Sequence, residues 1–209
     1  MKDLDLTLYL VSDSTDLSDE VFLKKIEDAC KGGVTLVQLR EKNKTTREYC
    51  ALARKVKKIT DAYQIPLIID DRIDVAMAVD ADGVHVGAED LPVSIARRLL
   101  GPDKIIGATA KSVEAATQAE SDGADYLGVG AIYPTTTKVK TVLTPVSTLN
   151  DICHRVTIPV GAIGGLNAEN CDILKGVPIQ GICVVSAIMK QDDCEEASRI
   201  LKEKIQSIR

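Results

Sequence analysis

The sequence lacks a long hydrophobic run and a basic segment. No apolar stretch approaches the roughly 18 residues that a membrane-spanning helix requires. The N-terminal "MKDLDLTLYLVSD" has acidic residues within its apolar part, unlike a secretory signal peptide. A net charge of -5, without a basic face or tail, argues against general nucleic-acid binding. We therefore expect a cytoplasmic protein with neither a membrane nor a nucleic acid as partner.

Paired-cysteine motifs are also absent. No two cysteines form a C-x-x-C pair, and a chain of 209 residues is too long to need disulfide bonds for its stability. We expect all of them to be small apolar residues of the core. The six cysteines are Cys30, Cys50, Cys153, Cys171, Cys183 and Cys194.

Histidine is scarce, with two residues in the chain. His85 lies inside the apolar segment "GVHVG", so we expect a core histidine with satisfied polar partners; contact with a substrate is the alternative. His154 lies in a predicted helix and is given no role. Hydrophobic residues make up 45% and charged residues 27%, ordinary values for a globular protein. No linker or low-complexity segment interrupts the chain, so a single domain over residues 1–209 is predicted.

Short β-branched runs alternate with helical patterns along the chain. The runs are "LTLYLV", "TLVQL", "LII", "GVHV", "IIGA", "YLGV", "IPVGAI" and "GICVV". Helix start signals precede most of the intervening segments. The residues expected to open helices are Ser18, Thr45 with Glu48, Pro145 after Thr144, Asn167, and Asp192 with Glu195; a shorter helix is expected over "IDVAMAVD".

Eight such runs imply parallel strands joined by right-handed crossovers. Their number and even spacing predict a small α/β fold, a single-domain (β/α)8 TIM barrel, with a doubly wound open sheet as the alternative. One connection, "AIYPTTTKVKTVLTP", is too long for a tight turn and is rich in hydroxyls and lysines. In a compact barrel such a loop is usually functional.

A barrel places its chemistry where the strands end and the following loops begin. Several polar residues of this sequence occupy those positions. They are Gln38, Arg40 and Lys42 after the second run; Asp70, Asp71 and Arg72 after the third; Glu89 and Asp90 after the fourth; Thr109 after the fifth; and Thr135, Thr136, Thr137 and Lys138 after the sixth. The seventh run ends in "GAIGG" and the eighth in "VVSA".

This grouping of cations and acids on one rim suggests a polyphosphate bound together with a divalent metal. Arg40, Lys42, Lys138 and Lys140 supply the cations in an otherwise acidic protein. Asp71 and Asp90 are hard oxygen ligands of the kind that Mg²⁺ takes, alongside phosphate oxygens and water. In the simpler interpretation the cations are solvated, Asp71 caps a helix, and Asp90 is a loop residue before Pro92.

The last two strands suggest a second anion site. "AIGG" and "VVSA" stand where barrels bind monophosphates with backbone N–H groups and the N-terminus of a short helix. Gly165 allows close approach of the backbone, and Ser186 adds a hydroxyl. A plain turn at Gly164–Gly165 is the alternative. Two separate anion sites would imply two phosphorylated substrates.

These segments, in order and across nearly the whole chain, resemble the thiamine phosphate synthase family. The matching segments are "LYLVSD", "GVTLVQLREK", "LIIDDRIDVAMAVDADGVHVGAEDLP", "GADYLGVGAIYPTTTK", "AIGG" and "VVSAI". The resemblance implies that hydroxymethylpyrimidine diphosphate is joined to thiazole phosphate, with release of diphosphate and no other partner than these small molecules. It also implies a dissociative substitution that needs no general base. Nothing in the sequence points to a particular oligomeric state.

The resemblance further assigns roles to residues. Arg40, Lys42 and Lys138 would stabilise the leaving diphosphate, and Asp71 and Asp90 would hold Mg²⁺. The substrate-binding residues would be Gln38, Leu39, Arg40, Glu41, Lys42, Asp70, Thr109, Thr135, Thr136, Thr137 and Lys138 for the pyrimidine diphosphate, with Gly165, Val185 and Ser186 for the thiazole phosphate.

Two positions depart from the family pattern. The family usually has asparagine at the position of Asp70, and commonly serine at that of Thr109, which keeps the hydroxyl. An ionised Asp70 cannot donate a hydrogen bond to a phosphate, so it is expected to join the metal ligands, to take up a proton or to turn toward Arg72; we favour the metal.

The alternatives for function are a thiazole tautomerase-like isomerase and a non-catalytic barrel that binds thiazole phosphate. A sugar-phosphate epimerase would need a catalytic carboxylate pair that the sequence does not show.

Overall fold

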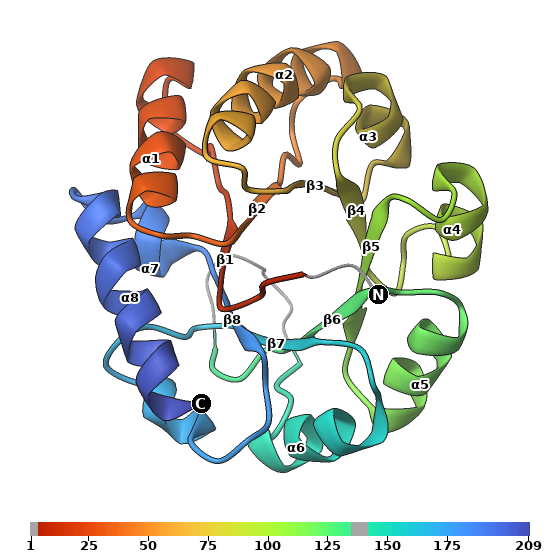
Figure 1. Cartoon of the computed structure of the whole chain (residues 1–209). Coiled ribbons are helices and arrows are strands. Elements are labelled where there is room, and N and C mark those ends of the chain that lie inside the picture. Colours follow the sequence, from red (N-terminus) through yellow and green to blue (C-terminus); the bar gives the residue numbers. More distant parts are fainter. Residues whose placement is uncertain (1–3, 135–141) are drawn as a thin grey trace.

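The protein is a closed barrel of parallel strands surrounded by helices (Figure 1). The computed structural model describes residues 4–134 and 142–209. Each described strand pairs with its neighbours in sequence order, and β1 pairs with β8 to close the sheet. The predicted (β/α)8 fold is therefore confirmed, and the open-sheet alternative is wrong. The prediction that one domain spans the whole chain stays a prediction.

Each of the predicted apolar runs overlaps a strand. The strands are β1 Leu8–Val11, β2 Leu36–Leu39, β3 Leu67–Asp70, β4 Gly83–Val86, β5 Ile105–Ala110, β6 Tyr126–Gly130, β7 Val160–Ile163 and β8 Gly181–Val184. The helices between and after them are α1 Asp19–Lys31, α2 Thr46–Ala62, α3 Ile73–Val79, α4 Val93–Leu100, α5 Val113–Ser121, α6 Val146–Arg155, the 3₁₀ helix η1 Cys171–Leu174, α7 Ser186–Met189 and α8 Cys194–Ile208. α8 packs beside α1 and completes the outer ring (Figure 1).

Two of the predicted helix starts are confirmed by their caps. The Ser18 hydroxyl accepts a hydrogen bond from the Val21 N–H at the start of α1. Thr45 and Glu48 form the reciprocal capping box at the start of α2. Each cap satisfies backbone donors that have no partner within the helix.

Three other start signals are corrected. The last helix is capped by Asp193, whose carboxylate accepts from the Glu196 N–H, one residue beyond the predicted Asp192. Pro145 occupies the cap position of α6 itself, and Val146 begins the helix. Asn167 instead closes a turn, accepting from the N–H groups of Glu169 and Asn170, and is followed by the short η1 instead of an α-helix.

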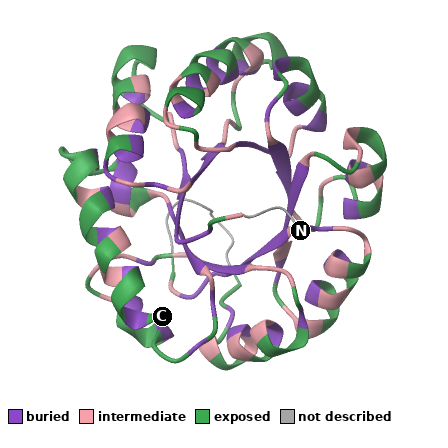
Figure 2. Cartoon of the chain, viewed as in Figure 1, coloured by how far each residue is buried: buried purple, intermediate pink, exposed green. Residues whose placement is uncertain are grey.

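The hydrophobic core has two layers, separated by the strands. The outer layer fills the space between the strands and the helices, as the buried inner faces of the helices show (Figure 2). A smaller cluster includes Tyr9, Leu36, Ile68, Tyr126 and Cys183, which alternate along the strands with residues of the outer layer. Because successive strand residues face opposite sides of the sheet, this cluster fills the barrel interior.

All six cysteines are free, as predicted. Cys50 and Cys153 are half-buried, and the other four are buried. None of the described helices is long and apolar enough to cross a membrane.

Candidate functional site

A cavity of about 180 Å³ opens at the carboxyl ends of the strands. It gathers predicted site residues from both halves of the chain. Those lining it are Gln38, Arg40, Asp70, Thr109, Gly165, Val185 and Ser186. Tyr9, His85 and Lys111 also line this cavity, and the sequence analysis assigned no site role to Tyr9 or Lys111.

A larger hollow of about 660 Å³ lies beside it, between the loops that follow β1 and β2. Arg40 borders both spaces, and Glu41 and Lys42 line the larger one. Glu41 accepts a hydrogen bond from the Ser14 hydroxyl at 2.8 Å, which ties these two loops together. Burial raises the pKa of the Glu41 carboxyl above its ordinary value.

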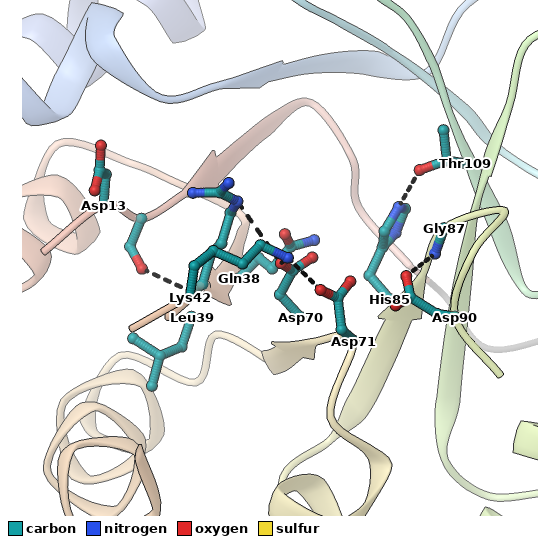
Figure 3. A network of polar contacts seen from close by, with 12 residues as sticks. Asp13, Gln38, Leu39, Lys42, Asp70, Asp71, His85, Gly87, Asp90 and Thr109 are labelled. Carbon is teal, nitrogen blue, oxygen red and sulfur yellow. Dashed lines mark hydrogen bonds and ion pairs between the residues drawn. The ribbon is translucent and has the colours of Figure 1, made fainter. Parts of the chain in front are cut away.

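Charges of opposite sign meet where β2 and β3 end. The Lys42 ammonium lies 2.8 Å from an Asp70 carboxylate oxygen and also hydrogen-bonds Asp71 (Figure 3). The Arg40 guanidinium lies 3.7 Å from the same Asp70 oxygen. Burial, together with the neighbouring Asp71 charge, raises the pKa of Asp70 despite these cations. Burial opposes the charge on Lys42, but its bonds to both aspartates outweigh this and raise its pKa.

Asp71 has an unusual backbone conformation that turns its side chain toward this cluster. Its φ of 59° lies in the left-handed region, which few residues other than glycine adopt. The Asp71 N–H donates to the His85 carbonyl at 2.9 Å. The interpretation of Asp71 as a helix cap is wrong, because Arg72 occupies the cap position of α3 and no side chain caps it.

Asp90 reaches the same cluster from the loop after β4. Its carboxylate accepts from the Gly87 N–H at 2.8 Å, which closes the loop (Figure 3). Burial, and then the proximity of Asp71, raises the pKa of Asp90. Burial works against ionised Asp71 as well, but its hydrogen bonds with Lys42 and Asp90 leave the pKa of Asp71 below its ordinary value. Two carboxyl groups from successive loops therefore contact each other.

Arg72 faces away from this cluster. Its guanidinium binds both carboxylate oxygens of Asp74, at 2.8 and 2.5 Å, and the Thr46 hydroxyl at 2.7 Å. The idea that Asp70 turns toward Arg72 is therefore wrong, and Lys42 takes that place.

On the opposite side of the cavity, the β7 end is built from backbone. Gly164 and Gly165 have φ values of 103° and 66°. A Cβ on Gly164 would lie 2.4 Å from the Ala131 Cβ, and one on Gly165 would lie 2.7 Å from the Tyr133 Cβ. Glycine is needed at both positions, for its conformation and for space. Ser186 begins the short α7 next to them and lines the same cavity.

Leu39 and the loop after β6 contribute differently from the other predicted residues. The Leu39 side chain is fully buried in the outer core layer, and its carbonyl accepts from the Tyr49 hydroxyl at 2.6 Å. The Leu39 side chain is therefore out of reach of a ligand in the cavity. Thr135, Thr136, Thr137, Lys138 and Lys140 lie outside the described residues.

The carboxylates of this cluster fit a hard cation whose remaining ligands come from a phosphate or from water. Asp70, Asp71 and Asp90 offer only carboxylate oxygens, the ligands that Mg²⁺ prefers. Within residues 4–134 and 142–209, no cluster of three or more metal-ligating side chains is preassembled. A divalent ion held here would therefore complete its coordination with phosphate oxygens and water, as Mg²⁺ commonly does. The Lys42 ammonium between two of the carboxylates shows that the pocket accommodates positive charge.

Comparison with known proteins places this site in a family. Residues 8–188 match the family model described as thiamine monophosphate synthase. The chain is 56% identical over 203 residues to thiamine-phosphate synthase 2 of Streptococcus pneumoniae, covering 97% of each chain. It is 55% identical over 191 residues to thiamine-phosphate synthase of Enterococcus faecalis, covering 91% of this chain and 90% of the relative.

A solved structure agrees with the sequence relatives. Thiamine phosphate pyrophosphorylase from Pyrococcus furiosus superposes with a TM-score of 0.89 at 36% identity, covering 98% of both chains. The match runs through the strand ends that carry the carboxylate cluster and the glycine turn. The chain belongs to the thiamine monophosphate synthase family.

Proposed function

We propose that this protein is a thiamine-phosphate synthase that joins hydroxymethylpyrimidine diphosphate to thiazole phosphate and releases diphosphate. The observation that carries the proposal is the pairing of a charged rim with a backbone-built rim around one cavity. Arg40, Lys42, Asp70 and Asp71 form the charged rim, with Asp90 beside them. Gly165, Val185 and Ser186 belong to the other rim. Two substrates that each carry phosphate suit such an arrangement.

The charged rim is suited to a leaving group whose negative charge grows. As the bond from the exocyclic carbon to the diphosphate breaks, charge develops on the departing oxygen. Asp70 holds Arg40 and Lys42 close together, so both cations are already gathered where a diphosphate would bind. Lys138 would add a third cation from the loop after β6.

Asp71 and Asp90, with Asp70 next to them, are the residues that would hold Mg²⁺. When bound, this ion would neutralise part of the diphosphate charge and so make it a better leaving group. Asp71 and Asp90 would fix the position of this ion, because their carboxyl groups already contact each other. Lys42 would then exchange carboxylate partners for phosphate oxygens.

The attacking atom needs no proton removed from it. The thiazole nitrogen reacts through a free lone pair and becomes a thiazolium, while the electron-rich aminopyrimidine stabilises the developing carbocation. The two rings must therefore be held so that the thiazole nitrogen lone pair, which lies in the plane of its ring, points at the exocyclic carbon, with water excluded. The residues near Gly165 and Ser186 would bind the thiazole phosphate, and Gln38 and Thr109 would contact the pyrimidine diphosphate.

The direct test mixes both substrates with the purified protein and Mg²⁺, and measures thiamine monophosphate and free diphosphate. Equal amounts of the two products are expected, with no reaction when either substrate or the metal is omitted. Absence of product from protein shown to be folded by circular dichroism would overturn the proposal. Binding of thiazole phosphate without Mg²⁺-dependent diphosphate binding, measured by calorimetry, would instead indicate the non-catalytic barrel. Isomerisation of the thiazole alone would indicate the tautomerase.

A further inference from the structure

A continuous chain of hydrogen bonds crosses the barrel interior beneath the cavity. The Gln38 amide nitrogen lies 2.6 Å from the Tyr9 hydroxyl, which lies 2.7 Å from the Tyr126 hydroxyl. The Tyr126 hydroxyl lies 3.1 Å from His85 Nδ1, and His85 Nε2 lies 3.0 Å from the Thr109 hydroxyl. The two ends of this hydrogen-bond chain, Gln38 and Thr109, both line the cavity. Figure 3 shows the contact between His85 and Thr109.

Most members of this chain are shielded from water. Tyr9 and Tyr126 are exposed by 1% and 0%, and Gln38 and His85 by 4% and 9%. At such depth each polar group must find its partner within the protein, because an unpaired one is costly. The strands leave room for these side chains by using glycine. A Cβ on Gly107 would lie 2.1 Å from the Tyr126 ring, and one on Gly128 would lie 3.3 Å from the His85 ring.

The proton inventory of these groups gives the chain a direction. A hydroxyl has one proton to donate, and a neutral imidazole has one donor and one acceptor nitrogen. If the Gln38 amide donates to Tyr9, then Tyr9 donates to Tyr126 and Tyr126 to His85 Nδ1. The remaining imidazole proton is on Nε2 and is donated to Thr109. In this direction each of the four contacts has one donor and one acceptor. The Thr109 hydroxyl keeps its own proton, which it can donate to a ligand.

The reverse direction inverts both ends together. Thr109 would donate to His85 Nε2, and the Gln38 carbonyl oxygen would accept from Tyr9. A ligand in the cavity would then face the Gln38 NH₂ group, a donor, and a Thr109 hydroxyl whose proton is already donated to His85. The forward direction instead offers the Gln38 oxygen as an acceptor and Thr109 as a donor. An amine at one end of a ligand and an anionic group at the other fit only the forward direction.

We propose that Tyr9, Tyr126 and His85 are positioning residues that hold the Gln38 amide and the Thr109 hydroxyl in the forward direction. This makes the cavity selective for a pyrimidine with an exocyclic amine over an analogue with an oxo group at that position. The inference rests on the proposed function for the identity of the pyrimidine substrate. The oxo group is an acceptor, as is the Gln38 oxygen that it would face. The two oxygens would repel each other, whereas an amine would donate a hydrogen bond to the Gln38 oxygen.

The substitution Tyr126→Phe tests this by removing the central hydroxyl while keeping the ring. Binding of the amino and oxo pyrimidine diphosphates is measured by calorimetry with Mg²⁺ and without thiazole phosphate, so that intrinsic reactivity does not enter. The unmodified protein should prefer the amino compound by about tenfold or more. Tyr126→Phe should lose most of that preference. Without the Tyr126 hydroxyl, Tyr9 no longer has a fixed direction, so the Gln38 amide can flip and exchange its oxygen and nitrogen.

Tyr49→Phe is the matched control. Tyr49 is also a fully buried tyrosine whose hydroxyl makes one short hydrogen bond, which it donates to the Leu39 carbonyl. It is not a member of the hydrogen-bond chain. Tyr49→Phe should preserve the preference ratio even where it lowers stability. Equal loss of preference in both variants, or full preference retained in Tyr126→Phe, would overturn the inference. Absence of thiamine phosphate formation by the unmodified protein would count against the proposed function instead.

A second measurement determines the direction of the hydrogen-bond chain from the tautomer of His85. Nitrogen NMR at alkaline pH, where a free imidazole is neutral, distinguishes the two tautomers. His85 should carry its proton on Nε2 in the complex with the amino pyrimidine diphosphate. His154, the other histidine of the sequence, has its Nδ1 at 2.8 Å from the Asn150 carbonyl and should show the opposite tautomer. A proton on Nδ1 of His85 in that complex would contradict the forward direction.

Discussion

The two rims of the cavity offer different means of binding an anion. At the ends of β2 and β3, charged side chains pair with one another, as Lys42 does with Asp70. At the ends of β7 and β8, the structure uses glycine conformation and a serine, and Gly164 and Gly165 leave no room for a side chain. The charged rim can rearrange its pairs when a ligand or metal arrives, whereas the backbone rim is set by the fold. The first should be sensitive to metal and charge, and the second to steric change.

The largest expected effect comes from adding a methyl group to the backbone rim. Gly165→Ala would place a Cβ 2.7 Å from the Tyr133 Cβ and 2.9 Å from the Pro134 carbonyl oxygen, at a φ of 66°. We expect the dissociation constant for thiazole phosphate, measured by calorimetry, to rise about a hundredfold, because the strained turn must move. Binding of the pyrimidine diphosphate should change much less.

Gly101→Ala provides the control for backbone conformation alone. Gly101 has a φ of 75°, but a Cβ there would meet nothing within 4 Å. This variant should lose about 1 kcal/mol of unfolding free energy in a denaturant titration and bind both substrates normally. If Gly165→Ala weakened both substrates equally, the two rims would not be separate sites.

On the charged rim, Asp71→Ala should lower turnover by more than about tenfold, because an ion that balances phosphate charge would lose a ligand. Steady-state kinetics at several Mg²⁺ concentrations measures the effect, and thiazole phosphate binding should barely change. Asp80→Ala is the matched control, since Asp80 is an aspartate with a left-handed φ of 52° at the end of α3. Unchanged turnover in Asp71→Ala would remove Asp71 from the metal site.

The smallest effect is expected at Asp70, where the family usually has asparagine. Asp70→Asn removes a charge that pairs with Lys42 and Arg40, and also the repulsion between Asp70 and Asp71. We expect kcat/KM to stay within about tenfold at saturating Mg²⁺ and the Mg²⁺ requirement to rise. A magnesium titration of both proteins measures this. Higher activity of the variant at every metal concentration would mean that Asp70 is an uncompensated charge.

The sequence predicted the barrel well because strand and helix periodicities are local. Every strand overlaps a predicted run, and the run "GVHV" coincides with β4, although β3, β5 and β6 extend one or two residues beyond their runs. The cap of α8 was misplaced by one residue because Asp192 and Asp193 are chemically alike, and only backbone geometry selects Asp193.

The site was predicted less completely, because partner choice depends on three-dimensional reach. The sequence placed Lys42, Asp70 and Asp71 at adjacent strand ends, but only the folded chain shows that Lys42 bridges both aspartates. Tyr9 and Tyr126 lie within predicted strand runs, and no site role was predicted for either. Their hydroxyls meet across the barrel from β1 and β6, strands that are not neighbours, so no sequence spacing could indicate the contact.

The space taken by the Tyr126 ring links two positions on neighbouring strands. Tyr126 on β6 pairs with Gly107 on β5, and a Cβ at residue 107 would lie 2.3 Å from the Tyr126 hydroxyl oxygen. Residue 107 therefore cannot gain a side chain while Tyr126 stays as it is. Among descendants of this chain, a side chain at residue 107 should be inherited only together with a smaller residue at 126. A smaller residue at 126 should instead be compatible with an unchanged Gly107.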